Sequence, residues 1–269
     1  MSKKEIFPGI HTVSSLLRWH PERVQSLWVE QHKNNRRIDQ LMELASQAGI
    51  SIQYVQRNKL DQMCESTQHQ GLAATCGPTP LVDEHDLLND LVNTSAPPLY
   101  LILDEVSDPH NLGACLRTAD AAGVDAVILP QRHTAPLTPT VHKTASGATV
   151  RLKIVRTANL ARCLDTIKKA GIWVYGAEGA SSHSVYQADF IHPTAIVMGA
   201  EGQGMRRLTR DKCDQLLALP MLGGVESLNV SVATGIFLFE AVRQRQSNDS
   251  ADYSGLHRPR LSSTLRSSI

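Results

Sequence analysis

Apolar and polar positions follow two different periods over residues 1–76. Apolar residues at positions 10, 13, 16 and 17 have the spacing of one helix face, and a second helical stretch closes at Gly49, a residue type that commonly ends helices. Short apolar runs between these stretches are typical of strands. The pattern predicts a small α/β domain with helices at 9–19, 35–48 and 59–64 and strands at 26–30, 51–55 and 71–76.

Two proline-containing runs then interrupt the pattern, GPTP at 77–80 and APP at 96–98. The residues between them include several acidic side chains and no basic one. Because such runs are turn and loop signals, residues 77–98 are predicted to be a linker, with a short helix near 85–92.

From residue 99 onward, strand-like and helix-like stretches alternate regularly. The run LYLIL at 99–103 has no charged residue, as expected for a strand buried on both faces of a parallel sheet. The alternation indicates an α/β fold with a mainly parallel, doubly wound sheet over residues 99–246. Strands are predicted at 99–103, 125–129, 152–156, 172–177, 194–199 and 216–219, and helices at 112–122, 160–170, 206–213 and from 230 onward. The stretch 138–146 is polar, and the Ser/Arg-rich residues 247–269 are predicted to be a disordered tail.

The composition favours a globular cytoplasmic protein. Of the 269 residues, 42% are hydrophobic and 20% are charged, and no apolar run has the length of a membrane span or forms a signal-peptide core. The 5 cysteines include no C-x-x-C pair, so neither a disulfide framework nor a zinc site is expected. Because the formal net charge is only +1, nucleic acid would have to bind through local basic clusters, such as those at 36–37, 168–169 and 206–210. Each of these clusters could equally be a solvated helix face.

Three polar loops follow predicted strands, at the ends where parallel α/β sheets bind ligands. Asn111 and Arg117 follow the strand at 99–103, and Glu201 lies in a glycine-rich turn. Ser227 and Asn229 lie between the last strand and the last helix. The last loop could be an ordinary strand–helix connection, and Arg117 could be an ion-pair partner instead of a catalytic group. Taken together, the three loops predict a small-ligand site.

Several common motifs are absent from the sequence. The glycines at 199–204 have the order G-x-x-G-x-G, which differs from the dinucleotide-binding G-x-G-x-x-G, and the chain has no G-x-x-x-x-G-K-[ST] phosphate loop. Ser227 lacks the G-x-S-x-G context of a hydrolase nucleophile. The histidines lack metal-ligand spacing, and we interpret His69 and His110 as hydrogen-bonded structural residues.

Three longer motifs resemble, in order, those of the SpoU/TrmH family of the SPOUT superfamily. They are LDEVSDPHNLGACLRTADAAG at 103–123, IVMGAEGQGM at 196–205 and LPMLGGVESLNVSVATGIFLFEA at 219–241. The runs PGIHTVSSLL at 8–17 and HQGLAA at 69–74 are similar to the L30e-like RNA-binding domain found in the family's large-subunit rRNA branch. Members of this family are S-adenosylmethionine-dependent RNA ribose 2′-O-methyltransferases.

The resemblance implies a SPOUT domain whose C-terminal segment is threaded into a deep trefoil knot, with an L30e-like domain before it. The methyl donor S-adenosylmethionine would lie in the knot, against backbone groups of Gly199, Leu219 and Leu228, with Met221 and Ala177 as walls. It also implies a homodimer that associates through the knotted domain, and neither a metal nor a membrane is involved.

The resemblance further implies which side chains carry the reaction. Arg117 matches the family's catalytic arginine, and Asn111, Glu201, Ser227 and Asn229 match its other polar positions. Because the pKa of a guanidinium exceeds about 12, we interpret Arg117 as stabilising the developing alkoxide, with Glu201 orienting Arg117. The implied reaction is methyl transfer to the ribose 2′-hydroxyl of a guanosine in 23S rRNA. A tRNA-directed enzyme and a non-catalytic rRNA-binding assembly factor are the alternatives.

Overall fold

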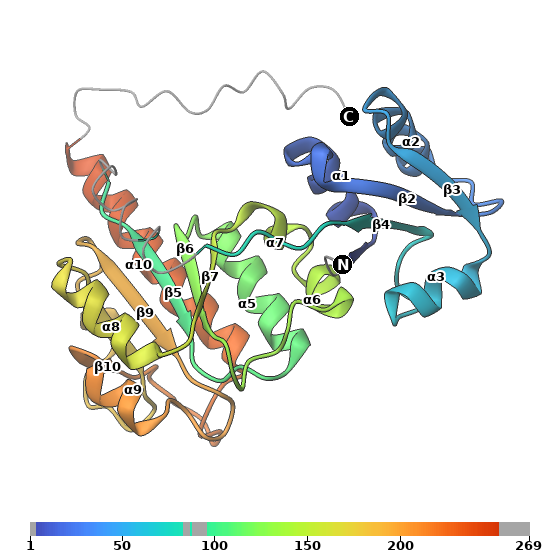
Figure 1. Ribbon diagram of the computed structural model, residues 1–269. Helices are drawn as coiled ribbons and strands as arrows, with labels where there is room; N and C mark the ends of the chain where they lie inside the picture. Colours follow the sequence, from blue (N-terminus) through green and yellow to red (C-terminus); the bar gives the residue numbers. More distant parts are fainter. Residues whose placement is uncertain (1–3, 83–86, 88–95, 253–269) are drawn as a thin grey trace.

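The structure, a computed structural model, describes residues 4–82, 87 and 96–252. The chain forms a four-stranded sheet in an N-terminal region (residues 4–82) and a six-stranded sheet in a C-terminal region (residues 96–252), as Figure 1 shows. Most of the helix predicted near 85–92 lies outside the described residues. No described helix combines the length and apolar character that crossing a membrane requires.

The N-terminal sheet has the strand order β1-β4-β2-β3, in which only β2 and β3 are parallel. Helices α1 and α2 pack on one face and α3 on the other, each over its own apolar cluster. The predicted helices and strands are confirmed with small shifts at their ends, whereas β1 was not predicted. The elements are β1 (Glu5–Pro8), α1 (Ile10–Trp19), the 3-10 turn η1 (Pro21–Arg23), β2 (Val24–Glu30), α2 (Arg36–Gln47), β3 (Ser51–Val55), α3 (Arg57–Cys64) and β4 (Leu72–Cys76).

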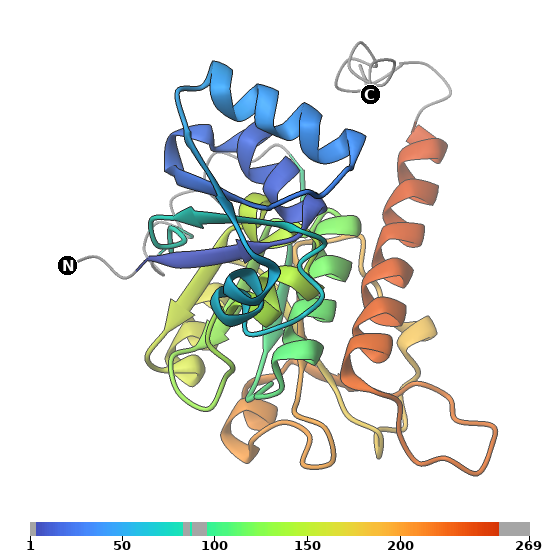
Figure 2. The ribbon, with the colours of Figure 1, turned by 90° about the vertical axis from the view of Figure 1, so that its right-hand side faces the viewer.

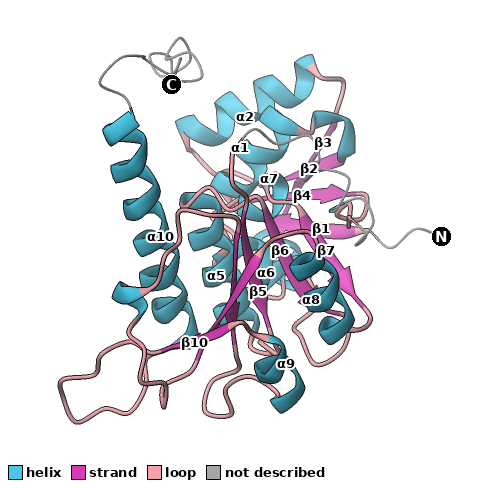
Figure 3. Ribbon diagram, turned by 90° about the vertical axis from the view of Figure 1, so that its left-hand side faces the viewer, coloured by secondary structure: helices cyan, strands magenta, loops and turns pink. Residues whose placement is uncertain are grey.

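The C-terminal sheet is parallel throughout, with the strand order β10-β8-β9-β5-β6-β7. Every residue of β5 is buried, which confirms the prediction made from its unbroken apolar run, and β6 and β9 are buried throughout as well. Figure 3 shows α5 and α10 on one side of this sheet and α8 and α9 on the other. The strands are β5 (Leu99–Leu103), β6 (Ala126–Pro130), β7 (Ile154–Thr157), β8 (Trp173–Ala177), β9 (Thr194–Met198) and β10 (Gln215–Leu217).

The helices of this region include two short ones, α6 and α7, in and just after the stretch expected to be a polar connection. Their brevity hides the helical period, and the buried Val141 and Val150 reveal their packing role only in the structure. The helical elements are α5 (Pro109–Ala121), α6 (Pro139–Thr144), α7 (Ala148–Arg151), α8 (Leu160–Lys169), the 3-10 turn η2 (Val185–Gln187), α9 (Arg207–Lys212) and α10 (Val230–Asp252).

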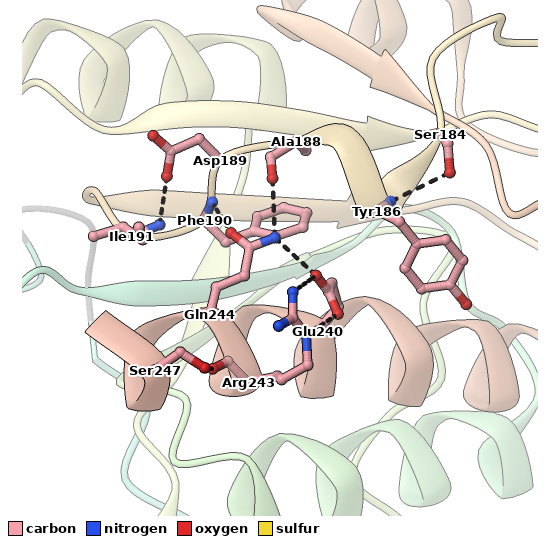
Figure 4. Close-up of polar contacts among 10 residues, drawn as sticks. All are labelled: Ser184, Tyr186, Ala188, Asp189, Phe190, Ile191, Glu240, Arg243, Gln244 and Ser247. Carbon is pink, nitrogen blue, oxygen red and sulfur yellow. Dashed lines mark hydrogen bonds and ion pairs between the residues drawn. The ribbon is translucent and has the colours of Figure 1, made fainter. Parts of the chain in front are cut away.

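Helix α10 is tied along its C-terminal half to the segment between β8 and β9. The Gln244 side chain donates to the carbonyl of Ala188 and accepts from the N–H of Phe190, at 3.0 and 2.9 Å (Figure 4). Arg245 donates to the carbonyl of Phe190 and to three further carbonyls, those of Pro97, Pro98 and His192. The helix runs to Asp252, so residues 247–252 of the predicted disordered tail are helical, and the rest of that prediction lies outside the described residues.

The two regions meet where α6 and α7 pack against the N-terminal core. Val150 belongs to the apolar cluster of α1 and α2, and the rings of His142 and Phe7 have centroids 3.9 Å apart. Arg151 donates to Ser15 of α1 at 2.6 Å and pairs with Asp120 of α5 at 2.5 Å. The junction is therefore packed and hydrogen-bonded, and it holds the N-terminal region against the face of the sheet that α5 covers.

Candidate active site

Three loops meet at the carboxyl ends of β5 and β9 and at the start of α10. They enclose a cavity of about 310 Å³, lined by residues from 105–111 and 200–203 together with His133 and Val230. Because the carboxyl ends of parallel strands lie at one edge of a sheet, segments far apart in the sequence converge there. The loops after β5 and β9 both line this cavity, and the loop before α10 is bonded to them through Asn229.

Asn229 is the residue that links the three loops. Its side-chain amide donates to Asn111 Oδ1 at 2.9 Å and to a carboxylate oxygen of Glu201. The Asn229 side-chain oxygen accepts from the N–H of Ser231, so Asn229 is also the N-cap of α10. Glu201 accepts a second bond from the N–H of Val230 at 3.2 Å. The carboxylate of Glu201 therefore lies at the positive end of the helix dipole of α10, where a negative charge is stabilised.

The loop after β9 closes on itself. Ala200 and Gly204 exchange two backbone hydrogen bonds of 3.0 and 2.9 Å, and Gly199 lies against the backbone of Gly204 and Met205. A Cβ added to Gly199 would lie 2.2 Å from the carbonyl carbon of Gly204, so no other residue fits without opening the loop. The close backbone approach that Gly199 permits is thus made within the loop, which sets the position of Glu201.

An ion pair not predicted from the sequence anchors this loop to the end of β5. Asp104 has 0% exposure and accepts from the N–H of Arg206 at 3.0 Å and from its guanidinium at 2.9 Å and 2.6 Å. Two further lining residues, Glu105 and His133, have φ angles of 62° and 61°, a left-handed conformation that non-glycine residues seldom adopt. The position of Asp104 directly after an unbroken apolar strand was the signal that could have indicated its role.

Of the predicted catalytic residues, the structure brings Asn111, Glu201 and Asn229 together and places two others apart. Arg117 is exposed on α5, and within the described part of the chain it has no hydrogen-bond or ion-pair partner. Helix α5 begins at Pro109, so Asn111 lies in its first turn and points to a different face from Arg117. Ser227 is exposed on the loop before α10. Glu201 contacts Asn229 and the α10 backbone, and the expected contact between Glu201 and Arg117 is not formed.

The predicted cofactor-binding residues lie around the loop before α10. Leu219 and Ala177 pack against the apolar cluster of the sheet, whereas Met221 and Leu228 are partly exposed. The segment 219–228 projects at the foot of α10 (Figure 2) and takes part in none of the backbone–backbone hydrogen bonds between described residues. Its N–H and C=O groups are therefore available to a ligand.

The charge of the cavity suits a cationic ligand. Its lining contains the carboxylates of Glu105, Asp108 and Glu201, of which only Glu105 forms an ion pair with a described cation, Arg206 at 3.5 Å. Asp108 also accepts from the N–H of His110 and caps α5. Within the described residues, no group of three or more His, Cys, Asp or Glu side chains could hold a metal ion.

Side chains elsewhere agree with structural roles. His69 has 1% exposure, its Nδ1 accepts from the N–H of Gly71 at 3.0 Å, and its Nε2 lies 2.9 Å from Asp61, which confirms its interpretation as a hydrogen-bonded structural residue. The five cysteines are free thiols, and four of them are buried. Burial raises the pKa of Cys64, Cys76 and Cys213 to about 12, so these thiols stay protonated near neutral pH.

The parallel sheet and the three convergent loops define an α/β protein that binds a small ligand at the carboxyl ends of its strands. The comparisons with known proteins are more specific. The family model described as the SpoU rRNA Methylase family matches residues 98–239, and a model described as RNA 2′-O ribose methyltransferase substrate binding matches residues 7–81. The chain belongs to the SpoU rRNA methylase family.

Relatives match over nearly the whole chain. The protein of Shewanella oneidensis named 23S rRNA (guanosine-2′-O-)-methyltransferase RlmB is 49% identical, over 92% of this chain and 100% of its own length. A crystal structure titled RNA 2′-O ribose methyltransferase has a TM-score of 0.77 at 25% identity and covers 91% of this chain and 90% of its own. An AdoMet-bound rRNA methyltransferase from Sinorhizobium meliloti has a TM-score of 0.71 at 25% identity, covering 89% and 87% of the two chains.

Proposed function

We propose that this protein transfers a methyl group from S-adenosylmethionine to the ribose 2′-hydroxyl of a guanosine in 23S rRNA. The observation that carries the proposal is the hydrogen-bonded convergence of Asn111, Glu201 and Asn229, one from each family motif. Asn111 and Glu201 line the cavity, and Asn229 bonds to both. The identity of 49% to a full-length relative named for this reaction supports the choice of substrate. A cytoplasmic location fits such a substrate.

The residues around the cavity fit S-adenosylmethionine. When bound, the donor supplies an activated methyl group on a positively charged sulfonium. Its charge suits the carboxylate-rich lining, and the free peptide groups near Leu219 and Leu228 would hold the adenosyl part together with the backbone of Gly199. Met221 and Ala177 would form apolar walls.

Arg117 would act on the attacking ribose oxygen. A guanidinium remains protonated at neutral pH, so Arg117 would stabilise the negative charge that develops on the 2′-oxygen instead of removing its proton. Glu201 would position Asn229 and the start of α10, since these are the groups it contacts. Asn111, Asn229 and Ser227 would then orient the ribose for in-line attack on the methyl group.

We further propose that the C-terminal segment is threaded as a trefoil knot. The segment between β8 and β9 is bonded to Ala218 after β10 on one side, through His183 and Val185, and to α10 on the other, through Gln244 and Arg245. The segment between β8 and β9 is therefore bonded both to the residue after β10 and to α10. The chain that connects β10 to α10 runs past this bonded segment. This is the arrangement that threading requires.

We also propose that the protein forms a homodimer through an exposed face of α10 in the C-terminal region. Val232 and Phe239 lie seven residues apart on α10, hence on one helix face, and are 51% and 49% exposed. Tyr186, whose ring lies beside α10 in Figure 4, is 56% exposed. An apolar helix face of this kind is commonly covered by a partner, and multi-angle light scattering should give twice the mass of the chain.

The N-terminal region would be a separate RNA-binding domain, joined through a linker at 77–98.

The experiment that tests the proposed function is a transfer assay with radiolabelled S-adenosylmethionine. Purified protein is incubated separately with unmodified rRNA and unmodified tRNA, and the label in each RNA is counted. Label in rRNA alone supports the proposal. Label in tRNA would indicate a tRNA-directed enzyme, and absence of label from both pools would indicate a non-catalytic RNA-binding protein.

A further inference from the structure

A second cavity, of about 320 Å³, lies at the junction of the two regions and shares no lining residue with the active-site cavity. Lys33 and Arg57 of the N-terminal region line it, and Lys143 on α6 lines it from the C-terminal region. Three cationic side chains from two parts of the chain therefore face one space. The motifs that define the family's methyl-transfer loops include none of them.

The three cations outnumber the carboxylates that contact them. Glu30, whose side chain is 14% exposed, is the one acidic side chain that the structure places within ion-pair range of Lys33 and Arg57, among the residues it describes. Its oxygens lie 3.7 Å from Lys33 Nζ and 3.9 Å from an Arg57 nitrogen, both near the limit of an ion pair. With one negative charge against three positive ones, the site has a net positive charge that suits an anion.

Lys143 has the least compensated charge of the three. Its ammonium donates to Gln70 Oε1 at 3.2 Å, and no carboxylate in the described part of the chain pairs with it. Burial lowers the pKa of Lys143, because the partly desolvated ammonium lacks a countercharge. An anion in the cavity would supply that countercharge.

The wall of the cavity is rigid before any ligand binds. Gln70 Oε1 also accepts from the N–H of Ile10 at the start of α1, so its side chain is fixed from two sides. The buried His69 braces the same loop through Gly71 and Asp61. Gly71 has a φ of 84°, and a Cβ there would lie 2.9 Å from a Glu30 oxygen and 3.0 Å from Lys33 Cγ. Gln70 and the loop that carries Gly71 are therefore fixed beside the cations.

One short segment connects this cavity to the active site. His133, after β6, lines the active-site cavity, and Lys143, near the end of α6, lines the junction cavity. Helix α6 itself, of 6 residues, spans about 9 Å. A ligand that touches both cavities must therefore reach across this segment, as an RNA chain can.

We propose that Lys33, Arg57 and Lys143 bind a backbone phosphate of the RNA substrate, away from the nucleotide that is methylated. The inference rests on the proposed function, since it names a contact of the same RNA. The contact gives the RNA a second attachment point that neither region provides alone. It also makes RNA binding depend on the junction between the two regions.

The test measures binding of an rRNA fragment by fluorescence anisotropy at salt concentrations from about 50 to about 200 mM. Over this range the affinity of a protein that contacts phosphates falls steeply with salt. Lys143→Met and Arg57→Gln should each weaken binding about tenfold and reduce the slope of log K against log salt by about 1. Lys143→Arg should restore most of the affinity, because arginine also binds phosphate. The matched control is Arg162→Gln, at an exposed arginine of α8 on the other face of the sheet, which should change neither quantity.

Methyl transfer and donor binding separate this inference from the proposed function. In the Lys143 and Arg57 variants, KM for RNA should rise while kcat at saturating RNA and the affinity for S-adenosylmethionine stay unchanged. Wild-type salt dependence in both variants overturns the inference and leaves the proposed function intact. A thermal stabilisation by inorganic phosphate that needs Lys143, combined with unchanged RNA binding, would show that the cavity binds free phosphate and also overturns it. Absence of methyl transfer by the wild type overturns the proposed function itself.

Discussion

Asn229 offers a direct test of how the active-site loops are held together. It caps α10 through its side-chain oxygen and joins Asn111 and Glu201 through its side-chain nitrogen. Asn229→Ser keeps a good cap and removes the two bonds made by the nitrogen, whereas Asn229→Ala also removes the bonds that the side-chain oxygen accepts from Ser231. The pair of substitutions therefore separates helix capping from loop coupling.

The expected magnitudes follow from the exposure of the site. Asn229 is exposed, so each of the two bonds made by its nitrogen should contribute about 0.5 kcal/mol, at the low end for a hydrogen bond. The Ser variant should thus lose about 1 kcal/mol of unfolding free energy. The Ala variant should lose about 2 kcal/mol, since an N-cap contributes about 1 kcal/mol more. Donor binding requires the three loops in their bonded arrangement, so the same free energy of about 1 kcal/mol should be lost from binding. Donor affinity in the Ser variant should therefore fall about fivefold.

Urea unfolding followed by circular dichroism gives the stabilities, and calorimetric titration gives the affinity for S-adenosylmethionine. Asn58→Ala is a matched control, because Asn58 is exposed within α3 and should change stability by no more than about 0.5 kcal/mol. Equal losses in the Ser and Ala variants would refute the capping role of Asn229. Wild-type stability and affinity in the Ser variant would refute the coupling of the loops.

Three further predictions concern the loop, the thiols and the junction. Gly199→Ala should open the loop after β9 and weaken donor binding at least about tenfold, whereas Gly77→Ala, where a Cβ meets nothing within 4 Å, should bind normally in the same titration. With a thiol reagent near pH 8 the native protein should react slowly, because burial raises the pKa of thiols such as Cys76 to about 12, and fast labelling of buried thiols would contradict this. Burial lowers the pKa of His142, so the neutral form is favoured in the folded state and stability should fall as pH drops below about 6.5. Urea unfolding at several pH values should show a shallower fall in His142→Gln, and an equal fall would exclude His142 as the cause.

The sequence predicted the elements whose period is long enough to be visible. The buried strand β5 was predicted from its unbroken apolar run, and β6 and β9 from the alternation of strand-like and helix-like stretches. By contrast, β1, α6 and α7 were missed. β1 is a four-residue strand that ends in Pro8, and α6 and α7 have fewer than two helical turns and lie in or next to a polar stretch. These are also the elements near the junction, so the way in which the two regions pack could not be predicted.

The site residues also fall into those that the sequence indicated and those that only the fold brings together. Residue type and position after a strand indicated Asn111, Glu201 and Asn229, and a resemblance to a known family supported their roles. The pair Asp104–Arg206 joins residues 102 positions apart, and only the strand order brings them together. No pattern along the chain indicated that Lys143 faces Lys33 and Arg57, because that contact depends on how two separate sheets pack.

Nucleoside analysis tests most directly whether the protein transfers a methyl group to a ribose oxygen of 23S rRNA. Unmodified 23S rRNA is incubated with S-adenosylmethionine and protein, digested to nucleosides and analysed by mass spectrometry. The wild type should produce 2′-O-methylguanosine, and Arg117→Ala should produce none while still binding the donor in a calorimetric titration. A guanosine methylated on its base, no methylated nucleoside at all, or full activity in Arg117→Ala would contradict the account.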